Sequence, residues 1–100
     1  MINNKVRDYL AEEHEEAGIF NVPNYDNSII GLTIDGRVVY DYDLMVKELM
    51  AQDNISMLEA IEFIEYNTIR TLPYVEETIR PIIMMHAENI KEIKNDSDKT

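Results

Sequence analysis

The chain has 100 residues, of which 20 are acidic and 9 are basic, and its formal net charge at pH 7 is −11. A surface of this sign repels nucleic acids and anionic membranes and favours basic protein partners. The chain contains no cysteine, which excludes disulfide bonds and thiolate metal sites.

The length predicts one domain with a modest core, and a hydrophobic fraction of 45% is ordinary for a globular protein. We expect this α+β domain to span residues 1–94 and a disordered polar tail to span residues 95–100. No apolar stretch reaches the length of a signal-peptide core or a membrane span, so we expect a cytoplasmic protein.

A first helix is predicted near the start of the chain. Asn3 or Asn4 can cap it, and Gly18 is placed to end it. Its inward side would consist of Val6, Tyr9, Leu10 and Ala17.

Residues 28–40 form two β-rich runs around Asp35-Gly36, which predicts a β-hairpin. A three-residue loop with Gly36 in a left-handed position gathers the apolar side chains on one face, whereas a one-residue shift would expose half of them. That register pairs Ile30 with Tyr40 and Leu32 with Val38.

Two helices are predicted after the hairpin. Asp41 or Asp43 can cap the first, and Asp53-Asn54 ends it. Its buried side chains would be Leu44 or Met45 with Leu49 and Met50.

The second of these helices begins with a capping box between Ser56 and Glu59 and is expected to end near Arg70, ahead of Pro73. Its inward side chains would be Leu58, Ile61, Ile64 and Thr68.

The segment from Pro81 to His86 fits either a strand or the first turn of a helix that runs through Ile90 and Ile93. We favour a strand at residues 82–86, followed by a short helix, because the hairpin needs a third strand. The predicted fold is therefore α+β: an N-terminal helix, a β-hairpin, two helices, and a closing strand that completes a three-stranded antiparallel sheet.

Four segments carry a resemblance: YDNSIIG at 25–31, DGRVVYDY at 35–42, EAIEFIEYNTIRTLPY at 59–74 and PII at 81–83. Over roughly residues 24–85 the chain is similar to a group of short uncharacterised proteins of Gram-positive bacteria and their phages and mobile elements. The resemblance implies this fold and a mobile-element context, and it implies no reaction.

Catalytic signals are lacking. Ser28 opens a strand, Ser56 caps a helix, and neither a G-x-S-x-G turn nor a glycine-rich phosphate loop occurs. His14 lacks the H-E-x-x-H spacing, and although Asp41 and Asp43 could hold a hard cation, helix capping explains them more simply. We therefore expect no enzyme, no metal site and no cofactor, and neither His14 nor His86 receives a role.

Two acidic helix faces are the main functional candidates. The first helix would present Asp8, Glu12 and Glu15 or Glu16, and the third would present Glu59, Glu62 and Glu65 with Tyr66. No lysine follows these third-helix glutamates at four residues' spacing to offset the repulsion. Such faces either serve solubility alone or bind a basic partner. The candidate partner-binding residues are Glu59, Glu62, Glu65, Tyr66, Asp8, Glu12 and Glu16.

Two further segments have both a structural and a recognition interpretation. Tyr40-Asp41-Tyr42-Asp43 combines a core tyrosine with a helix cap or forms a recognition edge. Asn67 and Arg70 either stabilise a helix end or contact a partner.

The functional hypothesis is a non-enzymatic acidic binding protein, a phage or mobile-element inhibitor of the anti-CRISPR or anti-restriction type. Its carboxylates would act as a DNA mimic on a basic nucleic-acid-binding protein. The alternative is a host regulatory or antitoxin-like module that binds through an apolar edge at Met84 and Met85. Either protein would be a monomer or a weak homodimer.

Overall fold

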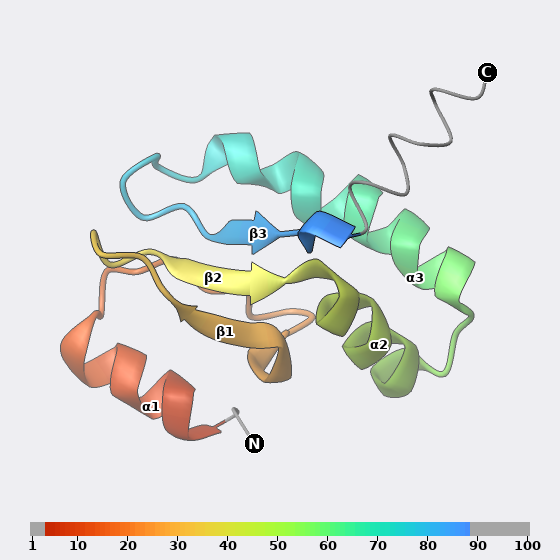
Figure 1. Ribbon diagram of the computed structural model, residues 1–100, viewed down its shortest axis with the longest axis horizontal. Coiled ribbons are helices and arrows are strands. Elements are labelled where there is room, and N and C mark those ends of the chain that lie inside the picture. The colour runs from red at the N-terminus through yellow and green to blue at the C-terminus, as the bar shows by residue number, and fades with distance from the viewer. Residues whose placement is uncertain (1–3, 89–100) are drawn as a thin grey trace.

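The computed structural model describes residues 4–88 (Figure 1). The expectations for Asn3, Ile90, Ile93 and the 95–100 tail lie outside these residues. No helix within them combines the length and the apolar character that a bilayer span requires. The elements in chain order are α1 (Asn4–Glu13), η1 (Asp26–Ser28), β1 (Ile29–Leu32), β2 (Val38–Asp41), α2 (Tyr42–Asp53), α3 (Met57–Phe63), η2 (Ile64–Thr68), η3 (Ile69–Tyr74) and β3 (Ile82–Met84).

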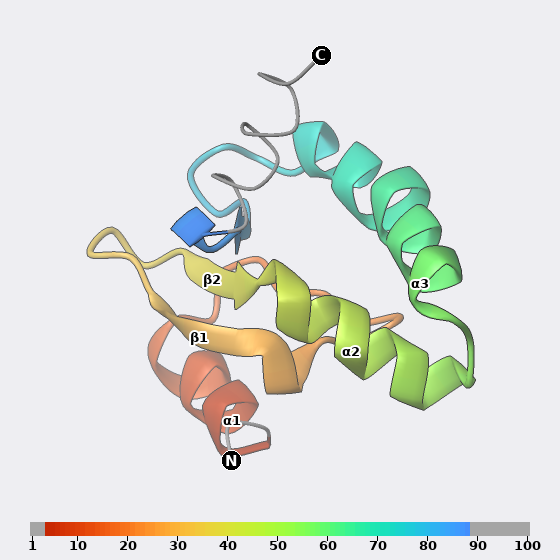
Figure 2. The same ribbon diagram turned by 45° about the vertical axis from the view of Figure 1, so that its right-hand side comes forward.

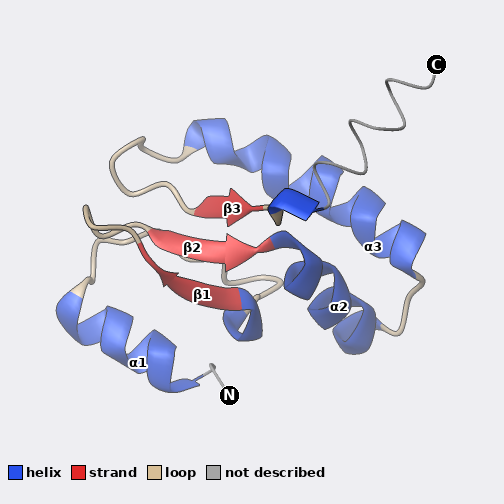
Figure 3. Ribbon diagram, viewed as in Figure 1, coloured by secondary structure: helices blue, strands red, loops and turns tan. Residues whose placement is uncertain are grey.

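The α+β class and the three-stranded sheet are confirmed, but the sheet is mixed (Figure 3). Its strand order is β1-β2-β3, with β1 antiparallel and β3 parallel to the central strand β2. The prediction of a fully antiparallel sheet was wrong because the chain crosses over through α2, α3, η2 and η3 before it reaches β3. Such a long helical connection returns the chain to the end of the sheet where it started, which makes the two strands parallel.

The hairpin has the predicted three-residue loop. Gly36 has φ +87°, and the Thr33 N–H donates to the Arg37 carbonyl at 2.8 Å. Leu32 pairs with Val38 as expected, whereas the pairing of Ile30 with Tyr40 was wrong. A bulge at Ile30 brings Ile29 opposite Tyr40 instead, so that Ile29 is buried and Ile30 is 40% exposed.

Helix α1 ends at Glu13, five residues before the expected end at Gly18. The run of glutamates after residue 11 has no large apolar side chain to hold further helix against the core. Leu10 is buried as predicted, but Tyr9 is 51% exposed. Gly18 serves a close approach instead of a helix cap: its N–H donates to the Ile79 carbonyl at 2.9 Å, and a Cβ there would lie 2.6 Å from that oxygen.

The predicted ends of α2 are confirmed. An oxygen of Asp41 accepts from the Leu44 N–H at 3.1 Å, and Asn54 adopts φ +54° at the C-terminal cap. Met45 and Leu49 are buried, as expected, together with Val46.

The capping box of Ser56 and Glu59 is also present, at the start of α3. The buried side chains of this helical segment are Ala60, Ile64 and Thr68. The prediction that Leu58 lies in the core was wrong, because Leu58 is 65% exposed. The helical segment does not stop near Arg70 but continues through a π turn and a 3₁₀ turn to Tyr74 (Figure 3). We call residues 57–74 together the α3 segment.

Polar contacts fix the loop between α1 and β1. The two carboxylate oxygens of Asp26 accept from Nε and Nη2 of Arg7, each at 2.7 Å. The Phe20 N–H donates to the Tyr40 hydroxyl at 3.1 Å, and the hydroxyls of Tyr25 and Thr68 are hydrogen-bonded at 3.1 Å. No buried side-chain nitrogen or oxygen among the described residues lacks a hydrogen-bond partner. These contacts join α1, the sheet and the α3 segment around one core.

Candidate functional site

The acidic face of the α3 segment is exposed, but two of its three glutamates also contribute to the fold. The Ser56 N–H donates to Oε1 of Glu59 at 3.0 Å, and this backbone contact together with the Ser56 hydroxyl lowers the pKa of Glu59. Oε2 of Glu65 accepts from the Tyr42 hydroxyl at 3.2 Å. Burial first, and then the charge of Glu65, raise the pKa of Tyr42 to about 12. Glu62 is the glutamate of this face that points to solvent without such a contact in the described chain.

The same face carries aromatic groups and one positive charge. The Arg70 guanidinium lies 5.7 Å from the ring centroid of Tyr66, which is 66% exposed. Asn67 donates through Nδ2 to the Phe63 carbonyl at 3.2 Å, one turn back along the same helical segment. Tyr74, at 90% exposure, lies beyond Arg70. The exposed surface of the α3 segment therefore combines acidic, aromatic and basic side chains.

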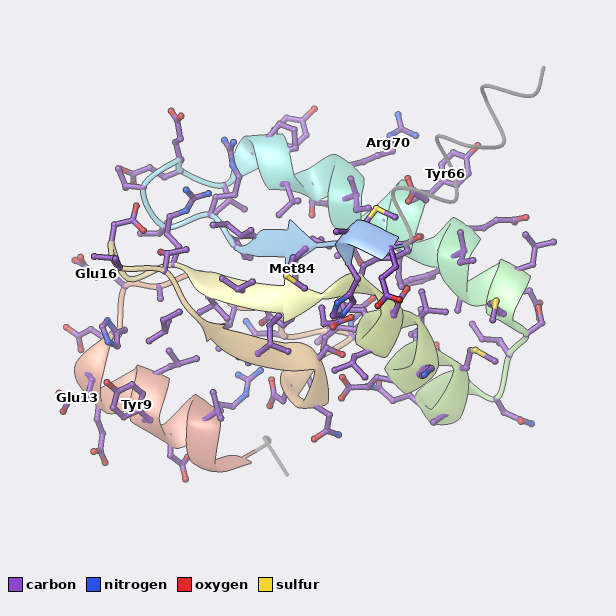
Figure 4. The ribbon with its side chains drawn as sticks, viewed as in Figure 1. Tyr9, Glu13, Glu16, Tyr66, Arg70 and Met84 are labelled. Atoms are coloured by element: carbon purple, nitrogen blue, oxygen red, sulfur yellow. The ribbon has the colours of Figure 1, made fainter. Side chains whose placement is uncertain are left out.

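The two predicted acidic faces do not form one surface. Helix α1 and the α3 segment lie on opposite sides of the sheet in both views (Figures 1 and 2). Figure 4 places Glu13 and Glu16 at one end of the molecule and Tyr66 and Arg70 toward the other. Asp8 and Glu12 are exposed on α1. A single partner surface of ordinary size would therefore engage one face or the other.

A concave acidic surface occurs at the end of α1. We call it the acidic hollow, and its volume is about 390 Å³. The chain just after α1, the tip of the hairpin and the loop before β3 all contribute to it. Its carboxylates are Glu13, Glu15, Glu16 and Asp35, and the half-buried His14 lies among them. Among the described residues that line it, none is a lysine or an arginine.

Sequence reasoning found only part of the acidic hollow. Glu16 was predicted on one helical face with Asp8 and Glu12, but the helix ends before Glu16 and the chain changes direction there. Asp35 was assigned only to the hairpin loop. The run of glutamates at residues 12–16 was the available signal, and the approach of the hairpin tip to that run is a tertiary contact that no local pattern predicts.

The segment Tyr40–Asp43 combines a core tyrosine with a helix cap. The Tyr40 side chain is fully buried, and burial raises its pKa to about 12. Asp41 caps α2 through Oδ1, while its Oδ2 lies 2.6 Å from Nε2 of His86. The hydrogen bond and the negative charge of Asp41 raise the pKa of His86. No local sequence pattern predicts this contact, because it depends on the parallel placement of β3.

Comparison of the chain with protein-family models, curated proteins and solved structures gave no match. The arrangement of the described residues is therefore the basis for the functional proposal.

Proposed function

We propose that the protein is a non-enzymatic binding protein that docks on a basic protein surface through the acidic hollow. One observation carries this proposal: four carboxylates from two distant segments converge on a concave surface that no described lysine or arginine lines. In comparison, the α3 face carries Arg70 and uses Glu59 and Glu65 in contacts within the fold.

Electrostatics supports this assignment. Carboxylates held near one another repel, and none of those in the acidic hollow lies within 4.0 Å of a described lysine or arginine nitrogen. A partner that inserts lysine or arginine side chains would relieve this repulsion, and the same long-range field would accelerate association. Binding of this origin weakens as salt concentration rises.

The partner class that best fits this chemistry is a nucleic-acid-binding protein. Such proteins present rows of lysine and arginine that normally contact phosphates. Carboxylates can take the place of those phosphates, so the bound acidic protein would compete with the nucleic acid. We therefore propose an inhibitor of the anti-CRISPR or anti-restriction type as the biological role.

The location of the docking surface can be tested on the isolated protein. We would titrate the ¹⁵N-labelled full chain with a ten-residue lysine peptide and follow the amide resonances. The proposal predicts the largest shifts at residues 13–16, 35–36 and 78–79, with loss of binding in high salt. Shifts that centre on residues 59–66 would instead assign docking to the α3 face.

Matched variants test whether the same surface binds a natural partner. One variant carries Glu13→Gln, Glu15→Gln and Glu16→Gln, and the other carries Glu59→Gln, Glu62→Gln and Glu65→Gln, so both lose three charges. Gln keeps the capping box at position 59. A basic partner purified from nuclease-treated Gram-positive lysate should lose affinity for the first variant and retain it for the second. Association that resists both salt and the first variant would contradict the proposal and favour the edge at Met84 and Met85.

A further inference from the structure

A cluster of three metal-ligating residues lies away from the acidic hollow. Asp41 is the last residue of β2, Asp43 lies in the first turn of α2, and His86 follows the end of β3. One ligand atom from each of the three lies within 4.8 Å of the other two. The Asp41 side chain is 7% exposed, whereas that of His86 is 47% exposed. The cluster therefore has one buried ligand, Asp41, and is accessible to solvent at His86.

The donor atoms suit a small divalent ion. In a tetrahedral zinc site with bonds of about 2.0–2.2 Å, neighbouring ligand atoms are separated by about 3.3 Å. Oδ2 of Asp41 and Nε2 of His86 are now 2.6 Å apart. The exposed imidazole would therefore move outward by less than about 1 Å to admit the ion between them. Oδ1 of Asp41 would keep its hydrogen bond to the Leu44 N–H, so metal binding and helix capping use different oxygens.

We propose that Asp41, Asp43 and His86 form a binding site for a divalent transition-metal ion, with Zn²⁺ as the best fit. One imidazole and two carboxylates match the nitrogen and oxygen ligands of zinc, whereas calcium and magnesium take oxygen ligands. Three protein ligands leave a fourth position for water. The positive end of α2 opposes a cation here, but its effect is small beside that of two carboxylates at bonding distance.

The way in which the fold brings a histidine to the two aspartates also supports the site. The parallel pairing of β2 with β3 places the carboxyl ends of both strands together. That pairing brings His86 near two aspartates that are 43 and 45 residues away in sequence. The negative charge of Glu88 also acts on His86. A bound ion would join the end of β3 to the start of α2.

Zinc binding to the untagged full chain tests the site. We would remove metals with a chelator, titrate Zn²⁺ by calorimetry, and repeat the titration with Co²⁺ to record its visible absorption. We expect one ion per chain, a rise in melting temperature, and a Co²⁺ spectrum typical of tetrahedral coordination. Asp43→Asn and His86→Gln should each weaken binding by more than about tenfold.

His14→Gln is the matched control, because the other histidine of the chain also lies among carboxylates. This variant should bind Zn²⁺ as the parent does. Loss of binding in His14→Gln, or equal binding in all the variants, would overturn the proposal, as would no binding at all. The imidazole nitrogen resonances of the parent protein provide a readout without mutation: those of His86 should shift with one equivalent of Zn²⁺, and an unshifted His86 would overturn the site. The acidic hollow contributes no ligand, so failure here would leave the docking proposal unaffected.

Discussion

The loop that precedes β1 and the acidic hollow use the same type of residue in opposite ways. Asp26 is 6% exposed, and both of its oxygens accept hydrogen bonds from Arg7. Glu13 and Glu16 lie in the open, and no described lysine or arginine pairs with them. A carboxylate of the first kind holds two segments of the chain together, whereas one of the second kind remains available to solvent or to a partner.

The comparison shows that the net charge overstates the surface available for docking. Glu48 accepts from the Ser28 hydroxyl at 2.8 Å and from the Asn27 N–H at 3.2 Å, and Glu59 completes a capping box. These carboxylates add to the net charge, but their oxygens accept hydrogen bonds within the fold. Substitutions that remove carboxylates of only one kind can separate the two.

Asp26→Asn should have the largest effect. The substitution removes a charge-assisted pair of hydrogen bonds and leaves the partly buried Arg7 without its counter-charge. We expect the free energy of unfolding in urea to fall by about 2–3 kcal/mol. Asp8→Asn, an exposed carboxylate on the same helix as Arg7, is the control and should stay within about 0.5 kcal/mol of the parent. An equal loss of stability in the two variants would contradict the distinction between structural and exposed carboxylates.

The second largest effect is a loss of folding stability at alkaline pH, caused by ionisation of the buried Tyr40. Burial raises the pKa of Tyr40 to about 12, from an ordinary value near 10. A raised pKa in the folded state means that Tyr40 contributes stability in full below pH 10, and that this contribution is lost as pH rises toward 12. The expected loss is roughly 2 kcal/mol. Absorbance at 295 nm should show later tyrosine ionisation in the folded protein than in urea, and coincident curves would contradict the prediction.

Features decided by short stretches of chain could be predicted from the sequence. The Gly36 loop, the Asp41 cap, the Asn54 terminus and the Ser56 capping box all depend on contacts within five residues. Their geometry follows from backbone preferences and side-chain reach. The rest of the fold could not be derived in this way.

Features decided by distant contacts were missed. The role of Gly18 depends on the Ile79 carbonyl, and the direction of β3 depends on the crossover through α2 and α3. The candidate sites share this origin. Asp35 reaches the acidic hollow, and His86 reaches Asp41, only because the tertiary fold brings them there.

The α3 segment offers an intermediate case, since Glu59 and Glu62 are both exposed on it. Ser56→Ala should lower the free energy of unfolding by about 1 kcal/mol because the Glu59 N–H loses its acceptor. Glu59→Ala should also destabilise, because the Ser56 N–H then loses Oε1 of Glu59. Glu62→Ala should leave the urea midpoint unchanged. Identical midpoints for the two glutamate variants would show that the Glu59 side chain contributes nothing to the capping box.

The smallest expected change has the opposite sign. Replacing Glu13, Glu15 and Glu16 by Gln removes repulsion within the acidic hollow and deletes no hydrogen bond to a described residue. We expect thermal and urea unfolding at low salt to show a gain of about 0.5 kcal/mol, which 1 M salt should abolish by screening. A variant that is more stable and yet fails to bind the lysine peptide would separate function from folding at this surface. A loss of stability would instead mean that these glutamates support the fold as Asp26 does, and the contrast between the two regions would disappear.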